Sequence, residues 1–179
     1  MAARDAERRD AFAEFVAARS AALHRTAYLM VGEHALAQDL LQEALTKTYV
    51  AWPRLREVAN AEAYTRKAIT TTAISWRRRR SWHEQPHETL PDRAGQRDAT
   101  GDTDTRAWVW AALQTLPPRQ RAAVVLRYYE DLTEAQTAEA MGCAVGTVKS
   151  QVSAAIKTLR TQLGTATGPV PLDELVVTR

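Results

Sequence analysis

The chain has 179 residues, of which 45% are hydrophobic and 25% charged, values typical of a folded protein with one or two compact domains. Its net charge of +3 and pI of 9.2 permit a nucleic-acid partner without requiring one. Its single cysteine, Cys143, excludes an internal disulfide and a cysteine-built zinc site. No apolar run approaches the ~20 residues of a membrane span, and the N-terminus lacks the hydrophobic core of a signal peptide. We therefore expect a cytoplasmic protein without membrane insertion.

Apolar residues recur every three to four positions through the first part of the chain, the spacing of one face of an amphipathic helix. This spacing predicts a first helix at Asp10–Met30 and a second at about Glu33–Trp52. The second helix should stop near Pro53, because the proline ring disrupts helical hydrogen bonding. A third helix is expected to begin near Asn60, a good N-cap residue, and to run into the arginines at 77–80.

The apolar periodicity disappears between His83 and Asp104, where prolines, glycines and carboxylates give the composition of a linker. Helical patterning resumes at Thr105, breaks at Pro117 and Pro118, and is lost again after residue 163. The sequence therefore predicts an all-α fold. Its parts are two helical domains at residues 8–82 and 105–163, a flexible linker at 83–104 and a loose tail at 164–179.

Residues 132–157 have the layout of a helix-turn-helix. Thr133 can cap the first helix, and Gly142 can supply a left-handed residue at the turn. Ala135, Ala138 and Met141 are expected to face inward. The small side chains of Ala135 and Ala138 allow two helices to cross closely.

The second helix of this motif is expected to start near Gly146 and Thr147 and to bury Val148, Val152, Ala155 and Leu159. The residues predicted to face outward are Lys149, Ser150, Gln151, Ser153 and Lys157. These side chains can donate to phosphates and base edges when such a helix lies in a major groove. An ordinary helical hairpin with a polar outer face is the alternative. The glycine in the turn favours DNA binding.

The C-terminal pattern resembles that of a known family. Leu116–Glu134, Ala138–Cys143 and Val145–Ser153 are similar to region 4 of extracytoplasmic-function (ECF) sigma factors, most of all the actinobacterial group often called the SigE family. Four upstream segments resemble region 2 of the same family in their order and spacing: Arg25–Leu29, Ala37–Leu45, Ala63–Ala68 and Ala73–Arg80.

The resemblance implies an alternative sigma factor that binds core RNA polymerase and directs promoter recognition and transcription initiation. Core polymerase and promoter DNA are then the partners, and an anti-sigma factor is a further candidate partner. Such a protein has no catalysis of its own and needs no cofactor or metal. A helix-turn-helix regulator that acts without core polymerase is the alternative, and a small nuclease is a more distant one.

The resemblance also implies three sets of contact residues. For core polymerase they are Asp39, Leu40, Gln42 and Glu43. For the −10 element they are Tyr64, Arg66, Lys67, Thr71, Trp76, Arg77, Arg78, Arg79 and Arg80. For the −35 element they are Arg119, Thr147, Lys149, Ser150, Gln151, Ser153 and Lys157.

The chemistry of these residues leaves alternatives open. Asp39 and Glu43 lie four residues apart, so both carboxylates share one helix face, which suits a basic partner. The same face can instead be solvated, with Glu43 paired to Lys47. Tyr64 and Trp76 can stack on unpaired bases or pack in the core. The four adjacent arginines gain most from a polyanion, although a solvated linker edge would also hold them.

Two departures from the family pattern affect DNA reading. Thr71 stands where relatives usually have Asn, and a lone hydroxyl cannot make a bidentate contact to a base edge. Ala154 and Ile156 stand where many relatives carry Arg or another polar residue, which predicts weaker binding to a −35 element.

Other chemistry is not expected. His83, Glu84, His87 and Glu88 repeat at four-residue spacing, but they lie in a segment interrupted by proline and lack a third ligand set. We therefore expect no metal there. Cys143 lies in the predicted turn, where a small apolar filler is a better interpretation than a reactive thiol.

Overall fold

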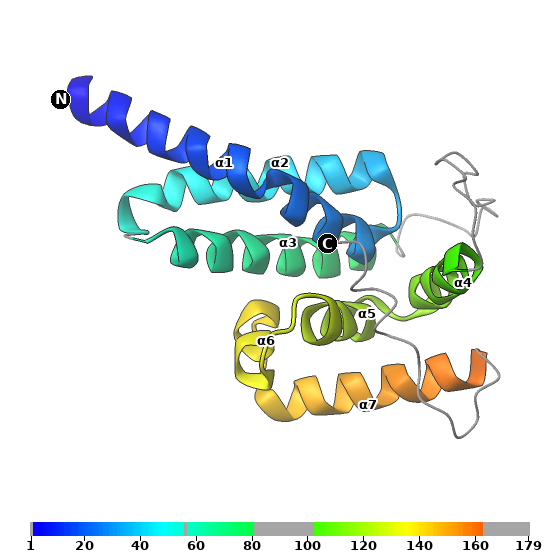
Figure 1. The fold of residues 1–179 in the computed structure, drawn as a ribbon. Helices are drawn as coiled ribbons and strands as arrows, with labels where there is room; N and C mark the ends of the chain where they lie inside the picture. Colours follow the sequence, from blue (N-terminus) through cyan, green and yellow to red (C-terminus); the bar gives the residue numbers. More distant parts are fainter. Residues whose placement is uncertain (1, 56, 81–101, 163–179) are drawn as a thin grey trace.

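The computed structural model describes residues 2–55, 57–80 and 102–162, and every regular element in these ranges is helical (Figure 1). The N-terminal half comprises α1 (Ala2–Val31), α2 (His34–Ala51), the 3-10 turn η1 (Trp52–Arg54) and α3 (Val58–Arg80). The C-terminal half comprises α4 (Asp102–Thr115), α5 (Pro118–Val124), the π-helical turn η2 (Val125–Tyr129), α6 (Glu134–Met141) and α7 (Val145–Gln162). The predicted all-α class is confirmed. Most of the predicted linker, and the predicted tail, lie outside the described residues.

The three long helices of the N-terminal half pack against one another, and the N-terminal end of α1 extends beyond the other two (Figure 1). Their shared core contains Phe15, Leu23, Leu40 and Ile69, all of which are buried. Gly32 ends α1 with a φ of +83°, a left-handed conformation that glycine adopts without strain. A Cβ added there would lie 2.4 Å from Oε1 of Gln114, so this glycine also makes room for a side chain of α4.

Three predicted helix starts are wrong. The first helix begins at Ala2, eight residues before the predicted start at Asp10. The third helix begins at Val58, and Asn60 lies inside it, because the amide of Ala61 already donates to the carbonyl of Glu57. The fourth begins at Asp102 rather than Thr105.

The helix-turn-helix prediction is confirmed in its local geometry. The Thr133 hydroxyl accepts from the amide of Gln136, and the Gln136 side chain accepts in return from the amide of Thr133, so the two form a capping box at the start of α6. Gly142 ends α6 with a φ of +62°. The prediction that Ala135 faces inward is wrong. The buried stripe of α6 is centred on Thr137, Ala138 and Met141, which leaves Ala135 on the exposed side.

The C-terminal half packs onto the N-terminal half, with α5 and α6 lying against α3 (Figure 1). At one end of this contact the ring of Tyr28 lies between His34, at a centroid distance of 4.1 Å, and Trp110, at 4.5 Å. Burial raises the pKa of the Tyr28 hydroxyl. The side chain of Gln114 also donates to the carbonyl of Leu29, at 3.2 Å.

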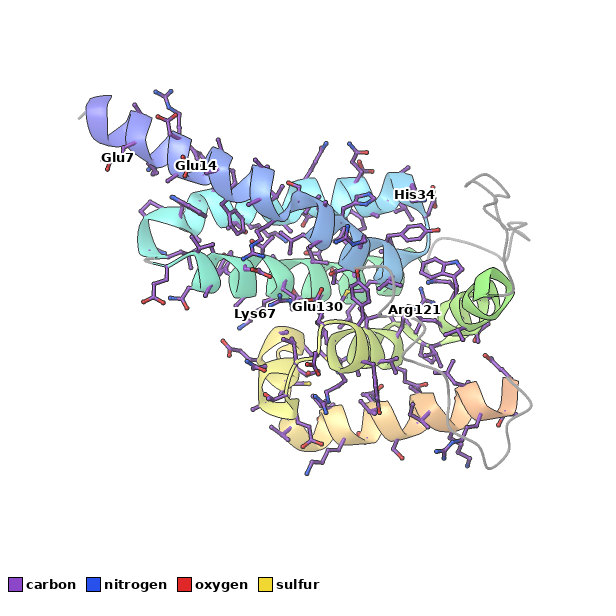
Figure 2. The ribbon with its side chains drawn as sticks, viewed as in Figure 1. Glu7, Glu14, His34, Lys67, Arg121 and Glu130 are labelled. Atoms are coloured by element: carbon purple, nitrogen blue, oxygen red, sulfur yellow. The ribbon has the colours of Figure 1, made fainter. Side chains whose placement is uncertain are left out.

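Arg121 is the fully buried cation at this contact, where α4 and α5 meet the N-terminal helices (Figure 2). Its guanidinium donates to the carbonyls of Leu113 and Leu116 at 3.1 Å each, and to both the carbonyl and the side-chain oxygen of Gln114. A further bond of 3.0 Å reaches the carbonyl of Met30, in the last turn of α1. The last carbonyls of a helix lack partners within it. Arg121 therefore caps two helices at once with its fork of five N–H donors.

No helix within the described ranges is both long enough and apolar enough to span a membrane.

Replacing Arg121 with Met keeps much of the side-chain volume but removes every donor, so buried carbonyls from α1 and α4 lose their partners. We expect the free energy of unfolding, measured by urea titration, to fall by ~2–4 kcal/mol. The matched control is Arg160→Met, at an exposed arginine of α7, which should change stability by no more than about 0.5 kcal/mol. Equal effects of the two substitutions would show that Arg121 has no special structural role.

Candidate nucleic-acid interface

The outer side of α7 presents a polar surface, and its inner side packs in the core. Val148, Ala155 and Leu159 are buried. The α7 face comprises six residues, of which Thr147 and Gln151 are half-buried and the others exposed: Thr147, Lys149, Ser150, Gln151, Ser153 and Lys157. Of the positions predicted to face inward, Val148, Ala155 and Leu159 are buried and Val152 is half-buried.

Contacts on the α7 face are sparse. Lys149 pairs with Glu134 of α6 at 3.4 Å, but both side chains are largely exposed, and such surface pairs contribute little. The Ser150 hydroxyl donates to the carbonyl of Thr147, at 2.9 Å. The amide of Gln151 makes no hydrogen bond within the described part of the chain. Its donors and acceptor are therefore available to a ligand.

Three neighbouring positions complete this surface. Arg119, predicted as part of the same set, is exposed in the first turn of α5, the helix that packs against α7. Ala154 is exposed, as its predicted place on the outer side requires. Ile156 is half-buried and packs against the core, and its effect on −35 binding stays a prediction.

A second polar surface runs along α3. Tyr64, Lys67 and Thr71 follow one another at three- and four-residue spacing, so they share one side of the helix, and all three are exposed. We call these three residues the α3 stripe, and Figure 2 shows Lys67 projecting from α3. Tyr64 is 37% exposed as a whole residue, which favours an outward position over core packing. Trp76 is half-buried and packs against the core, as its alternative interpretation predicted.

The hydroxyl of Thr71 donates to the carbonyl of Lys67, at 2.8 Å. Its oxygen keeps lone pairs that can accept a hydrogen bond. The predicted DNA-binding arginines 77–80 form the last turn of α3, but their side chains lie outside what the structure describes.

Arg66 has a different environment from the α3 stripe. Its Nε donates to Oε2 of Glu130 at 2.9 Å, and its Nη2 donates to Oε1 of Glu62 at 2.9 Å. Oε2 of Glu62 in turn lies 3.3 Å from Nε of Arg19, while the hydroxyl of Thr26 donates to Oε1 of Glu130. A predicted DNA-binding residue is thus the centre of an ionic network that joins α1, α3 and the segment after η2.

The sequence analysis did not identify this network. Glu62 lies four residues before Arg66, so the rule for helical ion pairs could have found that contact. Glu130 lies 64 residues beyond Arg66, and no local pattern marks it as the partner.

A third polar surface lies on α2. Asp39 and Gln42 are exposed and Glu43 is half-buried, and we call these three residues the α2 face. Leu40 is fully buried, so the prediction that it contacts a partner is wrong. The reason is helical spacing, because position 40 shares the inward side of α2 with Ala37 and Ala44.

Glu43 pairs with Lys47 at 2.7 Å, as the alternative interpretation of this face predicted. Lys47 also donates to the hydroxyl of Thr72, at 2.9 Å. Asp39 makes no ion pair with any described residue. It is therefore the more available carboxylate of the α2 face.

The described residues contain no group of three or more His, Cys, Asp or Glu side chains placed to hold a metal ion. The histidines and glutamates at 83–88 lie outside these residues. Cys143 is a free thiol, half-buried against the core in the turn between α6 and α7.

Comparison with known proteins identifies two family segments. Residues 15–83 match the model of Sigma-70 region 2, and residues 106–159 match that of Sigma-70, region 4. The chain is 41% identical over 152 residues to the RNA polymerase sigma-E factor of Streptomyces avermitilis, covering 85% of this chain and 84% of that protein. It is 32% identical over 164 residues to the ECF RNA polymerase sigma factor SigM of Mycobacterium tuberculosis, covering 92% and 83%.

A similar fold occurs in the sigma factor RpoE of Bartonella quintana, solved in complex with the anti-sigma factor NepR. The TM-score is 0.63 at 24% identity, covering 86% of this chain and 96% of that one.

Proposed function

The chain belongs to the extracytoplasmic-function (ECF) family of RNA polymerase sigma factors, which direct promoter recognition, and we propose that three separate surfaces carry out this task. The α7 face binds the −35 element, the α3 stripe and neighbouring arginines bind the −10 element, and the α2 face binds core polymerase. The observation that carries the proposal is the helix-turn-helix of α6 and α7, which leaves a polar side of α7 exposed.

On α7, position and chemistry assign different tasks to the residues. Gln151 lies in the first half of the helix, the part that reaches base edges when such a helix enters a major groove. Its free amide can pair bidentately with adenine. Lys149 and Lys157 are long exposed cations that contact phosphates regardless of sequence, as does Arg119 on α5. Thr147, Ser150 and Ser153 offer hydroxyls for single hydrogen bonds.

On α3, the exposed ring of Tyr64 can stack on an unpaired base. Lys67 and the arginines 77–80 extend the basic surface along the helix and contact phosphates. Thr71 supplies one hydroxyl, already bonded to the helix backbone, so it makes a single contact to a base. Trp76 supports the helix from the core side and does not stack on DNA.

On α2, Asp39 and Gln42 provide the exposed polar contacts with a basic surface of core polymerase. The neighbouring pair of Glu43 and Lys47 keeps a second carboxylate in a fixed position beside them. Transcription takes place at the chromosome, so the proposed location is the cytoplasm. The Bartonella sigma factor of similar fold binds an anti-sigma factor, and a partner of that class is proposed for this chain as well.

Transcription in vitro from a library of genomic promoters, with core polymerase alone or with the chain added, tests the function. A sigma factor makes core polymerase start at defined sites that share −35 and −10 sequences. A regulator that acts without polymerase would bind DNA in the absence of core and would give no new start sites, and that outcome would contradict the proposal.

Reversing the charge of Asp39 to Lys should weaken binding to core polymerase at least ~10-fold, because repulsion at a partly desolvated interface costs several kcal/mol. Glu43→Lys should have a smaller effect, since Lys47 already neutralises Glu43. Fluorescence titration of labelled protein with core polymerase measures both. The control is Glu14→Lys, at an exposed position of α1. If Asp39→Lys bound core polymerase as tightly as the control does, the α2 face would not be the surface that binds it.

Replacing Gln151 with Ala should weaken the free energy of binding to the preferred promoter by ~1–3 kcal/mol. It should also relax discrimination between bases at one position of the −35 element. Lys157→Ala, in contrast, should weaken binding to all promoters about equally, since phosphate contacts carry no sequence information. Competition between −35 variants, with holoenzyme formed from each mutant, measures the difference. Unchanged promoter selectivity of Gln151→Ala would show that another residue reads the bases.

The converse substitution adds a contact to the same helix. Ala154 is exposed on α7, so Arg at this position has room to reach a phosphate. Ala154→Arg should strengthen −35 binding. It should also steepen the slope of log affinity against log salt concentration by about one, because one more counterion is released. An unchanged salt dependence would mean that position 154 does not face the DNA.

A further inference from the structure

We propose that Glu134 lowers the affinity of the chain for −35 DNA by pairing with Lys149, a cation of the α7 face. This role rests on the proposed function of the α7 face as the surface that binds the −35 element. The charged residues assigned to that task are otherwise basic, namely Arg119, Lys149 and Lys157. Glu134 belongs to α6, the other helix of the motif, and it adds a carboxylate to the same surface.

The side chains of Glu134 and Lys149 meet where α6 and α7 lie next to each other (Figure 1). Oε2 of Glu134 lies 3.4 Å from Nζ of Lys149. The two side chains are 44% and 62% exposed, so both charged groups face solvent. A DNA phosphate that reaches the ammonium group of Lys149 therefore also comes close to the carboxylate of Glu134.

The backbone around Glu134 holds its carboxylate beside α7. Glu134 is the first residue of α6, and the capping box between Thr133 and Gln136 encloses it. The first helix of a helix-turn-helix crosses the DNA backbone when the second lies in the major groove. The start of α6 is therefore close to phosphates for a second reason, which does not depend on Lys149.

Glu134 opposes the binding of DNA in two ways. It neutralises part of the charge with which Lys149 attracts a phosphate, and its own negative charge repels that phosphate. In the free protein the pair contributes little to stability, because water surrounds both groups. Bound DNA displaces some of this water, so the same charges interact more strongly in the complex.

The effect is expected to be equal for all DNA sequences, because phosphate contacts carry no sequence information. Glu134 therefore lowers the affinity of α7 for DNA and leaves the reading of bases by Gln151 unchanged. A weak −35 contact makes the holoenzyme depend on the −10 element as well, since two weak contacts in one complex strengthen each other. We infer that Glu134 makes initiation require both promoter elements.

A purely structural role for Glu134 leads to a different expectation. A carboxylate in the first turn of a helix interacts favourably with the positive end of the helix dipole, and Glu134 occupies such a position in α6. If this were its only role, removing the charge would lower the midpoint of urea unfolding and would not raise the affinity for DNA.

Glu134→Gln tests the proposal because it removes the charge and keeps the size of the side chain. Holoenzyme formed with this variant is titrated with a short duplex that carries the preferred −35 element but no −10 element, and with a duplex of scrambled sequence. The affinity for both should rise about three- to tenfold. The slope of log affinity against log salt concentration should steepen by about one, because Lys149 is released for a phosphate.

Two further variants serve as controls. Glu139→Gln removes an exposed carboxylate nearer the other end of the same helix, so it corrects for the change in net charge. Glu134→Ala should raise the affinity as Glu134→Gln does, which would show that the amide introduced by Gln is not the source of the gain.

Lys149→Met tests whether the carboxylate acts through Lys149. Adding Glu134→Gln to Lys149→Met should raise the affinity less than Glu134→Gln does alone, because no cation is left to release. An equal gain in both backgrounds would show that Glu134 does not act on Lys149, and the proposed pairing would be wrong.

The outcomes separate the role of Glu134 from the function on which it rests. Affinities of Glu134→Gln equal to those of Glu139→Gln would overturn the role of Glu134 and leave the α7 face standing. A gain for the scrambled duplex alone would contradict the expected equal effect on all sequences. The α7 face itself would be wrong if Lys149→Met and Gln151→Ala both bound the −35 duplex as tightly as the unsubstituted chain.

Discussion

The way the two halves of this chain pack depends on the polar groups that their contact buries. Buried N–H, C=O and charged groups need partners, and leaving one unpaired costs more than a typical hydrogen bond contributes. Arg121 meets this requirement for the ends of α1 and α4, and Glu130 meets it for Arg66 and Thr26. Hydrogen bonds and ion pairs are directional, so these contacts favour one arrangement of the two halves. Apolar packing between small residues is less directional and would favour that arrangement less strongly.

This arrangement links the stability of the chain to its function. Helical spacing places the three proposed binding surfaces on different helices, so each can act without distorting the others. The contact between the halves leaves α2 and α7 accessible and engages Arg66 of α3.

Local rules predicted most of the fold. The apolar period, the cap at Thr133 and the glycine at position 142 depend on residues within a few positions of one another, so the sequence contains all of the relevant physics. The errors arose where a local pattern is compatible with both a buried and an exposed position for the same residue. Leu40 was assigned outward with its acidic neighbours although it lies on the apolar side of α2, and Tyr64 fits a helical period yet remains exposed.

The contacts between the halves could not be predicted in this way. Arg66 and Glu130 lie 64 residues apart, and Arg121 reaches a carbonyl 91 residues away. A charged residue in a helical pattern is usually solvated, so nothing local distinguishes Arg121 from exposed Arg119. Only the packing of the two halves reveals that one caps buried helix ends and the other does not.

The claim that polar contacts hold the two halves in this packing can be tested by energy transfer between fluorophores on the two halves. Labels attached to Ala17→Cys on α1 and Glu139→Cys on α6, both exposed positions, would report their separation in a Cys143→Ser background. The account predicts efficient transfer in the free protein and lower transfer in Glu130→Gln, which loses the charge that pairs with Arg66. Equal transfer in the two proteins would contradict it.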